Sequence, residues 1–362
     1  MLLRYTRATT MIVRKKKAPA QHTIKNVYIR RALFILAGVG IMACLAGICI
    51  YIAFQVSPWP SALLVRNQFE KGGVAMNEIL AKYTSDTVAV EKDLHYDTSD
   101  NDAFLDIYRP KGKYPTTTIV WVHGGGWLAG NKDDNAPWAN ILASKGFTVA
   151  MVGYSLAPEK HYPLPVQQVN NAIGYLSRHS DQLRIDKNKL ILAGDSAGAQ
   201  IAAQVALINT NSGYASKLGI AATVGPRQIA GLLLNCGPYD ISLVNPESTD
   251  QGAQLVRLFL WSYTGDKHFY QDPHLQYASI PQFVTSDFPP SFITAGNADP
   301  LLQHSINLAH ALEKVHVTTT PLFYPENYTP ALNHEYQFNL DTKEGKQALD
   351  AMVQFANSVT SK

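Results

Sequence analysis

Residues 189–204 read Lys-Leu-Ile-Leu-Ala-Gly-Asp-Ser-Ala-Gly-Ala-Gln-Ile-Ala-Ala-Gln. The first five residues are typical of a strand, and the last six are typical of a helix. Between them, Gly194 and Gly198 flank Ser196 in a G-x-S-x-G pattern, where a sharp turn leaves no room for bulky side chains. The pattern predicts that the Ser196 hydroxyl is exposed at a helix amino terminus, where backbone N–H groups favour negative charge.

The rest of the chain alternates short apolar runs with helical patterns. Strands are expected at residues 88–90, 103–108, 116–122, 147–152, 190–193, 229–234, 291–294 and 319–323. Helices are expected at residues 136–144, 165–178, 197–208, 301–315 and 343–357. The alternation predicts an α/β fold with a mostly parallel central sheet, helices on both faces and an antiparallel hairpin at its first edge.

Two segments fall outside that alternation. Residues 57–86 have the pattern of a linker with one or two amphipathic helices. Residues 244–285 combine an apolar-aromatic helix with loops rich in His, Asp, Pro and Tyr, which is typical of an insertion above the sheet. We expect both segments to form a helical cap over a pocket of the catalytic domain, which spans residues 87–362.

Basic residues are concentrated at the amino terminus. Residues 1–31 contain nine Lys or Arg and no acidic residue, whereas the remaining chain has 22 basic and 28 acidic residues. The folded part is therefore acidic, and it lacks the basic surface that nucleic-acid binding requires. We expect residues 1–31 to be a cytoplasmic segment and nucleic acid not to be a partner.

The basic segment is followed by an apolar stretch, residues 32–56, without a charged side chain. As a helix it is ~37 Å long, enough to cross ~30 Å of hydrocarbon. Because the basic residues precede it, the positive-inside rule puts the catalytic domain outside the cytoplasm. Alternatives are a cleaved signal peptide, whose apolar core is about 7–15 residues long, and a lipid-modified Cys44 or Cys49, beyond which the apolar sequence continues. A buried helix of a globular core does not suit the charged flank.

A serine hydroxyl becomes a nucleophile when a base takes its proton and a carboxylate orients that base. In α/β-hydrolases the chain order is serine, acid, histidine. Asp299 lies in the loop after the strand 291–294, just before a helix expected to start at Pro300, and His334 lies between the last strand and the last helix. Taken singly, Asp299 could be a helix N-cap and His334 a structural loop histidine. Their order after Ser196 favours a catalytic triad.

A glycine-rich loop follows the buried strand that ends at Val122. Its sequence, residues 123–127, is His-Gly-Gly-Gly-Trp, and its glycines allow backbone N–H groups to approach a substrate closely. A phosphate-binding loop would need a Gly-Lys-Ser/Thr ending, which is missing here. We expect an oxyanion hole built from the amides of Gly124, Gly125, Gly126 and Ala197.

The remaining site expectations concern the pocket and its cofactors. Candidate pocket residues are aromatic, and ordinary core or cap packing is the alternative for each: Trp127, Tyr154, Trp261 and Tyr263. No cofactor or metal is implied, because the pair His334-Glu335 has no second histidine at zinc-motif spacing. Cys236 is the one cysteine outside the apolar stretch, so the domain cannot form an internal disulfide.

These motifs together resemble the hormone-sensitive-lipase-like esterases of the α/β-hydrolase fold. The resemblance runs from about Leu105 to the end of the chain, and its motifs are residues 105–110 (LDIYRP), 123–127 (HGGGW), 154–159 (YSLAPE), 194–198 (GDSAG), 299–301 (DPL) and His334. It implies that Ser196 is the nucleophile, His334 the base and then the acid, and Asp299 the orienting carboxylate, under a cap of amino-terminal helices. Departures from the family pattern are Ser155 in place of Arg, Gln303 near an expected Asp, and Glu335 in place of Gly.

The main functional hypothesis is a membrane-anchored serine carboxylic ester hydrolase that acts through an acyl-enzyme on small or medium acyl esters. Its partners would be a small-molecule or lipid ester and the membrane, through residues 32–56. One alternative is a lipase or deacetylase acting on membrane lipids or surface glycans. A second is a non-catalytic binding module on a hydrolase fold, which would be expected to lack a triad member. The sequence does not indicate an oligomeric state.

Overall fold

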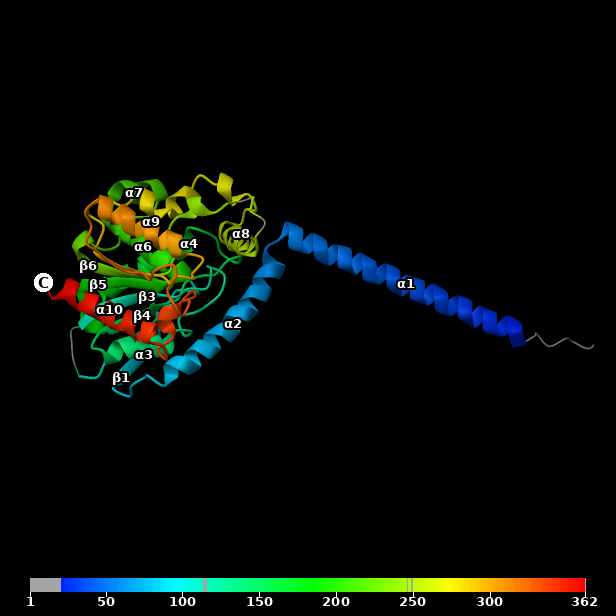
Figure 1. Ribbon diagram of the computed structural model, residues 1–362, viewed down its shortest axis with the longest axis horizontal. Helices are drawn as coiled ribbons and strands as arrows, with labels where there is room; N and C mark the ends of the chain where they lie inside the picture. The colour runs from blue at the N-terminus through cyan, green and yellow to red at the C-terminus, as the bar shows by residue number, and fades with distance from the viewer. Residues whose placement is uncertain (1–20, 113–115, 246, 249, 362) are drawn as a thin grey trace, which may run out of the picture. The chain divides into compact units, whose positions relative to one another are not determined.

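The structure is a computed structural model that describes residues 21–112, 116–245, 247–248 and 250–361, and it divides into the units Met1–Ser57 and Pro58–Lys362 (Figure 1). The described part of the first unit is one helix, α1 (Gln21–Val56), which contains the predicted membrane segment. The first 20 residues of the predicted cytoplasmic segment lie outside the described residues. Among the described helices, only α1 is long and apolar enough to cross a membrane, with a mean hydropathy of 2.6 over its most apolar window.

The second unit is built on an eight-stranded sheet with the order β1-β2-β4-β3-β5-β6-β7-β8. The strands are β1 (Val88–His95), β2 (Phe104–Pro110), β3 (Thr116–Val122), β4 (Thr148–Val152), β5 (Ile185–Asp195), β6 (Ile229–Asn235), β7 (Ser291–Thr294) and β8 (Thr319–Leu322). β2 pairs antiparallel with both β1 and β4, and all other pairs are parallel. The predicted α/β fold with a mostly parallel sheet is confirmed.

Helices cover both faces of this sheet (Figure 1). One face carries α4 (Leu164–Arg178), α6 (Ser196–Thr210) and α9 (Leu302–Lys314), and the other carries α3 (Ala136–Ser144) and α10 (Lys343–Thr360). Alternate residues of β3 enter the two cores, with Val120 and Val122 on the α6 face and Ile119 and Trp121 on the α3 face. The near-continuous apolar run of β3 is therefore explained by burial on both faces.

The strands that flank the candidate site end at one edge of the sheet. Val122 at the end of β3 pairs with Gly194 of β5, and Asp195 pairs with Asn235 at the end of β6. Asn235 in turn pairs with Thr294, the last residue of β7. Because parallel strands end at the same edge, the loops after β3, β5, β6 and β7 meet there.

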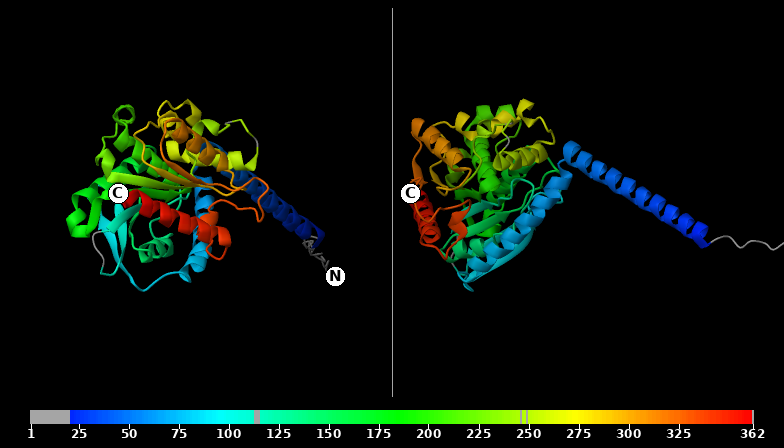
Figure 2. Two further views of the ribbon diagram at one scale, coloured as in Figure 1. Left: turned by 60° about the vertical axis from the view of Figure 1, so that its left-hand side comes forward. Right: turned by 45° about the vertical axis from the view of Figure 1, so that its right-hand side comes forward.

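The two segments predicted to form a cap are helical within the second unit (Figure 2). Residues 57–86 contain a single helix, α2 (Trp59–Ala81), where one or two were expected. Its Arg66 donates hydrogen bonds to the carbonyls of Leu128 and Ala157, both at 2.6 Å, and forms an ion pair with Glu159. Residues 244–285 contain α8 (Gln251–Thr264) and three short 3₁₀ turns, at Phe269–Gln271, Leu275–Ala278 and Ile280–Gln282. Phe69 of α2 contacts Phe259 of α8 edge to face.

Candidate active site

The turn between β5 and α6 is as tight as the sequence predicts. A Cβ atom added to Gly198 would lie 2.1 Å from the Val122 carbonyl oxygen and 2.4 Å from that of His123. Ser196 itself has φ +50°, a conformation that is unfavourable for a residue with a side chain. The tight packing of β3 against the turn therefore holds half-buried Ser196 in a strained backbone conformation, as is common at functional sites.

Replacing Gly198 by alanine is expected to destabilise the second unit severely. The added methyl group would meet backbone atoms, which cannot move aside as a flexible side chain could. Overpacking typically costs about 1–3 kcal/mol, and because the contacts here are with backbone oxygens, we expect a loss of about 3 kcal/mol in the free energy of unfolding. Denaturant unfolding of the two proteins measures it, and an unchanged midpoint in G198A would contradict the geometry of this turn.

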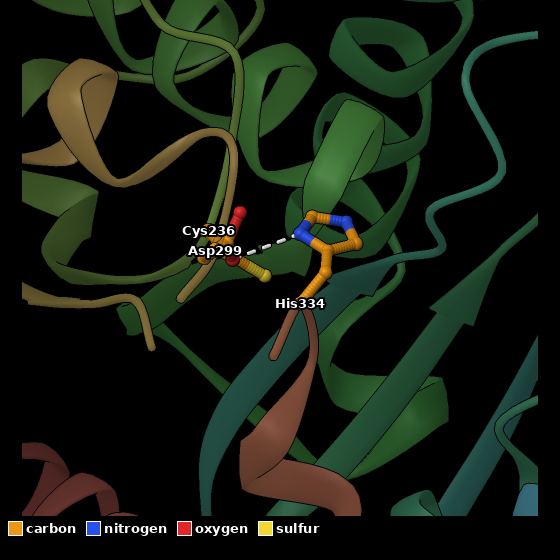
Figure 3. A group of neighbouring side chains, drawn as sticks. All are labelled: Cys236, Asp299 and His334. Carbon is orange, nitrogen blue, oxygen red and sulfur yellow. Dashed lines mark hydrogen bonds and ion pairs between the residues drawn. The ribbon is translucent and has the colours of Figure 1, made fainter. Parts of the chain in front are cut away.

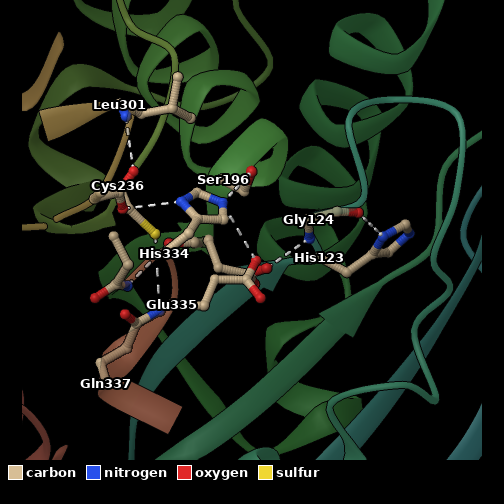
Figure 4. Close-up of polar contacts among 12 residues, drawn as sticks. His123, Gly124, Ser196, Cys236, Leu301, His334, Glu335 and Gln337 are labelled. Atoms are coloured by element: carbon tan, nitrogen blue, oxygen red, sulfur yellow. Dashed lines mark hydrogen bonds and ion pairs between the residues drawn. The ribbon is translucent and has the colours of Figure 1, made fainter. Parts of the chain in front are cut away.

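The structure brings together the three residues predicted to form a triad. His334 Nε2 lies 3.0 Å from Ser196 Oγ, and His334 Nδ1 lies 2.9 Å from Asp299 Oδ2 (Figure 4). The Asp299 carboxylate is fully buried, and its other oxygen accepts the Leu301 N–H at 2.7 Å. This second bond fixes the carboxylate, so the imidazole is oriented with Nε2 toward the serine. The following helix, α9, begins at Leu302 and not at the expected Pro300, since Pro300 and Leu301 form the turn that Asp299 holds.

The electrostatic surroundings of His334 favour the protonated ring. Burial lowers the pKa of the imidazole, but neighbouring Cys236 and hydrogen-bonded Asp299 outweigh it, and the pKa is raised well above its usual value. The ring edge remains 32% exposed, so a substrate can reach it. His334 is therefore suited to take the Ser196 proton and to hold it as an imidazolium.

Cys236 lies beside the triad on the Asp299 side of the imidazole (Figure 3). One ligand atom from each of Cys236, Asp299 and His334 lies within 4.8 Å of the others, a set that suits a soft cation. Asp299 and His334 are already hydrogen-bonded to each other, however, and burial raises the pKa of the Cys236 thiol. The geometry is that of a hydrogen-bonded pair next to a buried thiol, and we assign no metal ion to it.

The glycine loop after β3 reaches the same site, with one correction to the predicted oxyanion hole. The Gly124 N–H donates to Asp195 Oδ2 at 2.9 Å, so Gly124 anchors the loop instead of facing a substrate. Within the described part of the chain, the N–H groups of Gly125, Gly126 and Ala197 have no acceptor. Three of the four predicted donors thus remain available for a developing negative charge.

Buried side chains hold the glycine loop in place. Asp195 also accepts the Trp121 Nε1–H at 2.8 Å, and the Tyr154 hydroxyl donates to the His123 carbonyl at 2.9 Å. Burial lowers the pKa of His123 to about 4, so its ring is neutral and donates Nδ1–H to the Gly124 carbonyl, 2.8 Å away. The loop is therefore rigidly positioned before any substrate binds.

The four aromatic residues predicted to line the pocket differ in their surroundings, and two of them, Trp127 and Tyr263, are packed against each other. Trp127 and Tyr263 are 2% and 0% exposed and stack on each other, and Trp261 carries Lys267 over its ring at 5.2 Å. Tyr154 stacks on His123 and borders a cavity of about 460 Å³ beside the glycine loop, which Ser196 does not line. The sequence pattern could not separate these roles, because buried and pocket-lining aromatics look alike along the chain.

Comparisons with known proteins agree with this geometry. Residues 105–312 match the model of the BD-FAE family, which is more than half of the chain. The chain belongs to the BD-FAE family. This α/β-hydrolase family is related to the hormone-sensitive-lipase-like esterases, so the resemblance drawn from the motifs is confirmed. The matched residues include Ser196 and Asp299, and they end before His334.

Relatives and solved structures show the same fold. An acetyl esterase of Salmonella paratyphi B is 28% identical over 228 residues, which are 59% of this chain and 64% of that protein, so the chain spans less than two thirds of this relative. Esterase B of Lactobacillus rhamnosis has a TM-score of 0.71 at 23% identity, covering 83% of this chain and 96% of its own. A bacterial heroin esterase has a TM-score of 0.65 at 21% identity, covering 81% and 90%. At these identities the structures establish the fold.

Two acidic residues near the triad, Asp195 and Glu335, have contacts that the sequence did not predict. Asp195 is the second residue of the G-D-S-A-G motif, and its anchoring of Gly124 depends on two strands that are distant in sequence. Glu335 departs from the family pattern directly after His334, which was the available signal, and its carboxylate lies 3.8 Å from His334 Nε2. These two side chains come close to each other only in the folded chain, where the loops after β3, β5 and β8 meet.

Proposed function

We propose that this protein is a serine carboxylic ester hydrolase that acts through an acyl-enzyme. The observation that carries the proposal is the continuous hydrogen-bonded line from Ser196 Oγ through His334 to Asp299, next to backbone N–H groups without acceptors. A non-catalytic binding module has no need of that line, which is why we favour an enzyme. The acetyl esterase relative supports the same reaction class.

In the proposed reaction, Ser196 Oγ attacks the ester carbonyl carbon while its proton moves to His334 Nε2. The carbonyl oxygen becomes an oxyanion that accepts hydrogen bonds from Gly125, Gly126 and Ala197. The imidazolium then gives its proton to the leaving alkoxide, and the alcohol departs. Water, deprotonated by His334, attacks the acyl-serine, and collapse of the second intermediate returns the proton to Ser196 and releases the acid.

Small or medium acyl esters are the proposed substrates. The acetyl esterase relative favours a short acyl group. The Phe259 ring of α8 lies close to Gly126, because a Cβ atom built there would be 3.2 Å from it. We therefore assign α2 and α8 to a cap that adjoins the oxyanion loop, with residues 244–285 as its insertion and residues 87–362 as the catalytic domain.

We further propose that α1 anchors the enzyme in a membrane, with its amino terminus in the cytoplasm and the catalytic domain outside. Support comes from the length and hydropathy of α1 and from the basic residues that precede it. Nearly all of its side chains from residue 25 to 56 are exposed, as lipid contact requires. The anchor also favours the second candidate, a lipase or deacetylase acting on membrane lipids or surface glycans, because α2 begins only three residues after Val56.

A series of p-nitrophenyl esters distinguishes these substrates. With the full chain in detergent micelles, we expect the highest kcat/KM for acyl groups of about two to six carbons and a decline beyond that, since a cap adjoins the oxyanion loop. A maximum at long chains that depends on micelles would support the lipase alternative. Hydrolysis of none of the esters, together with no labelling by a phosphonate, would contradict an esterase of either kind.

A further inference from the structure

Glu335 has an unfavourable backbone conformation for its residue type. Its φ and ψ are +61° and +28°, in the left-handed region where glycine has no Cβ penalty. A long charged side chain at such a position is uncommon, and strained residues of this kind gather at functional sites. The contacts of the Glu335 side chain are therefore a candidate reason for this backbone conformation.

The Glu335 carboxylate lies on the reactive edge of the catalytic imidazole. Its Oε1 is 3.8 Å from His334 Nε2, the nitrogen that is also 3.0 Å from Ser196 Oγ (Figure 4). Asp299 is bonded to the opposite nitrogen, Nδ1. The imidazole is thus placed between two carboxyl groups, one at each nitrogen, and the side chain of Glu335 is only 32% exposed.

The Asp195 carboxyl is an electrostatic neighbour of Glu335. Burial and the adjacent Glu335 carboxyl raise the pKa of Asp195 well above its usual range. The neutral form of buried Asp195 is therefore favoured, and a neutral Asp195 does not repel the Glu335 carboxylate beside His334. Neither acid forms an ion pair with Lys or Arg among the described residues.

We propose, on the basis of the proposed hydrolase function, that Glu335 is a second carboxylate of the catalytic site, which stabilises the His334 imidazolium from its Nε2 side. When the Ser196 proton reaches Nε2, the ring becomes positive next to a negative oxygen 3.8 Å away. The attraction is absent while the ring is neutral, so it favours proton transfer specifically. Asp195 is a positioning residue, because it acts through Gly124.

Other titratable groups around the imidazole fix the sign of the pH effect. They are Asp299, Cys236, Asp195 and Glu335, together with the phenols of Tyr154 and Tyr239 near Asp195. The reaction needs neutral His334, so kcat/KM rises with pH through the pKa of this residue, and this rise is the acid limb of the pH profile. Loss of the Glu335 charge lowers the pKa of His334 and moves the acid limb to lower pH. Asp195 itself lies outside ion-pair distance of His334 among the described contacts.

The test compares Glu335→Gln, Glu335→Asp and Glu335→Gly in the full chain, with Glu326→Gln as a matched exposed control. We expect E335Q to lower kcat/KM for a short p-nitrophenyl ester about three- to tenfold and to move the acid limb down by roughly 0.5–1 pH unit. E335D keeps a carboxylate, so its kcat/KM and the position of its acid limb should lie between those of the wild type and E335Q. E335G should relieve the backbone, with an unchanged or higher Tm, yet show the same activity loss.

An NMR titration of the His334 ring, in protein with labelled histidines, separates this inference from the proposed function. A lower His334 midpoint in E335Q than in the wild type supports the role of Glu335, even if no ester is hydrolysed, in which case only the proposed function fails. Equal midpoints, with equal kcat/KM and acid limbs in the wild type, E335Q and E335G, would overturn the inference. A Tm loss in E335Q without a midpoint change would likewise assign Glu335 a structural role only.

Discussion

Replacing Ser196 by alanine is expected to reduce kcat for ester hydrolysis by about 10⁵- to 10⁶-fold, because the atom that forms the acyl bond is removed. The fold should not suffer, since the substitution deletes one oxygen whose protein hydrogen bond is to His334. The Tm of S196A is therefore expected to stay within a few degrees of the wild type. Hydrolysis of a p-nitrophenyl ester by both purified proteins provides the measurement.

The control for this variant is Ser358→Ala on α10, where the hydroxyl only donates to the Phe355 carbonyl. It should keep wild-type kcat and KM. If S196A retained a tenth or more of the wild-type activity, Ser196 would not be the nucleophile. A residual rate about 10³- to 10⁴-fold above the uncatalysed reaction is consistent with binding and oxyanion stabilisation alone.

The second large effect is expected for Asp299→Asn, with a fall in kcat of about 10⁴-fold. The carboxylate accepts a hydrogen bond from His334 Nδ1–H at 2.9 Å, which leaves Nε2 free to take the serine proton. An amide group that donates to Nδ1 would place the ring proton on Nε2 instead, and Ser196 would face a donor. KM should change little, because Asp299 is buried and does not line the exposed edge of the site.

Asp350→Asn on the exposed surface of α10 is the matched control for this variant and should behave as the wild type. Steady-state kinetics over a range of pH gives kcat and KM separately. A D299N protein with kcat within tenfold of the wild type would show that His334 is oriented by another group.

Much of the fold could be predicted because its strands are short apolar runs with clear ends. The predicted bounds are confirmed for β3 (Thr116–Val122), β7 (Ser291–Thr294) and α3 (Ala136–Ser144). A strand buried on both faces, or a helix buried on one, has a clear apolar pattern in the sequence. Short helices such as α7 (Ser212–Leu218) were missed, because seven residues carry too little periodicity. The start of α9 differed because a local bond from Asp299 extends the preceding turn.

The candidate site was predictable as far as its motifs follow from local geometry. Ser196, Asp299 and His334 could be chosen from their order along the fold, and the structure brings them together. The orientation of single amides and carboxyls could not be predicted. Gly124 donates to Asp195 rather than toward the substrate, and Glu335 approaches both His334 and Asp195, because loops distant in sequence pack against each other.

The most direct test of the nucleophile is covalent labelling with a short-chain alkyl phosphonate, followed by mass spectrometry of tryptic peptides. The account predicts one adduct per chain, on Ser196 in the peptide spanning residues 190–217. It also predicts labelling at least about 10³-fold slower in D299N, because that variant lacks the carboxylate that orients His334. An adduct on any other residue, or no adduct on folded protein, would contradict the assignment of Ser196.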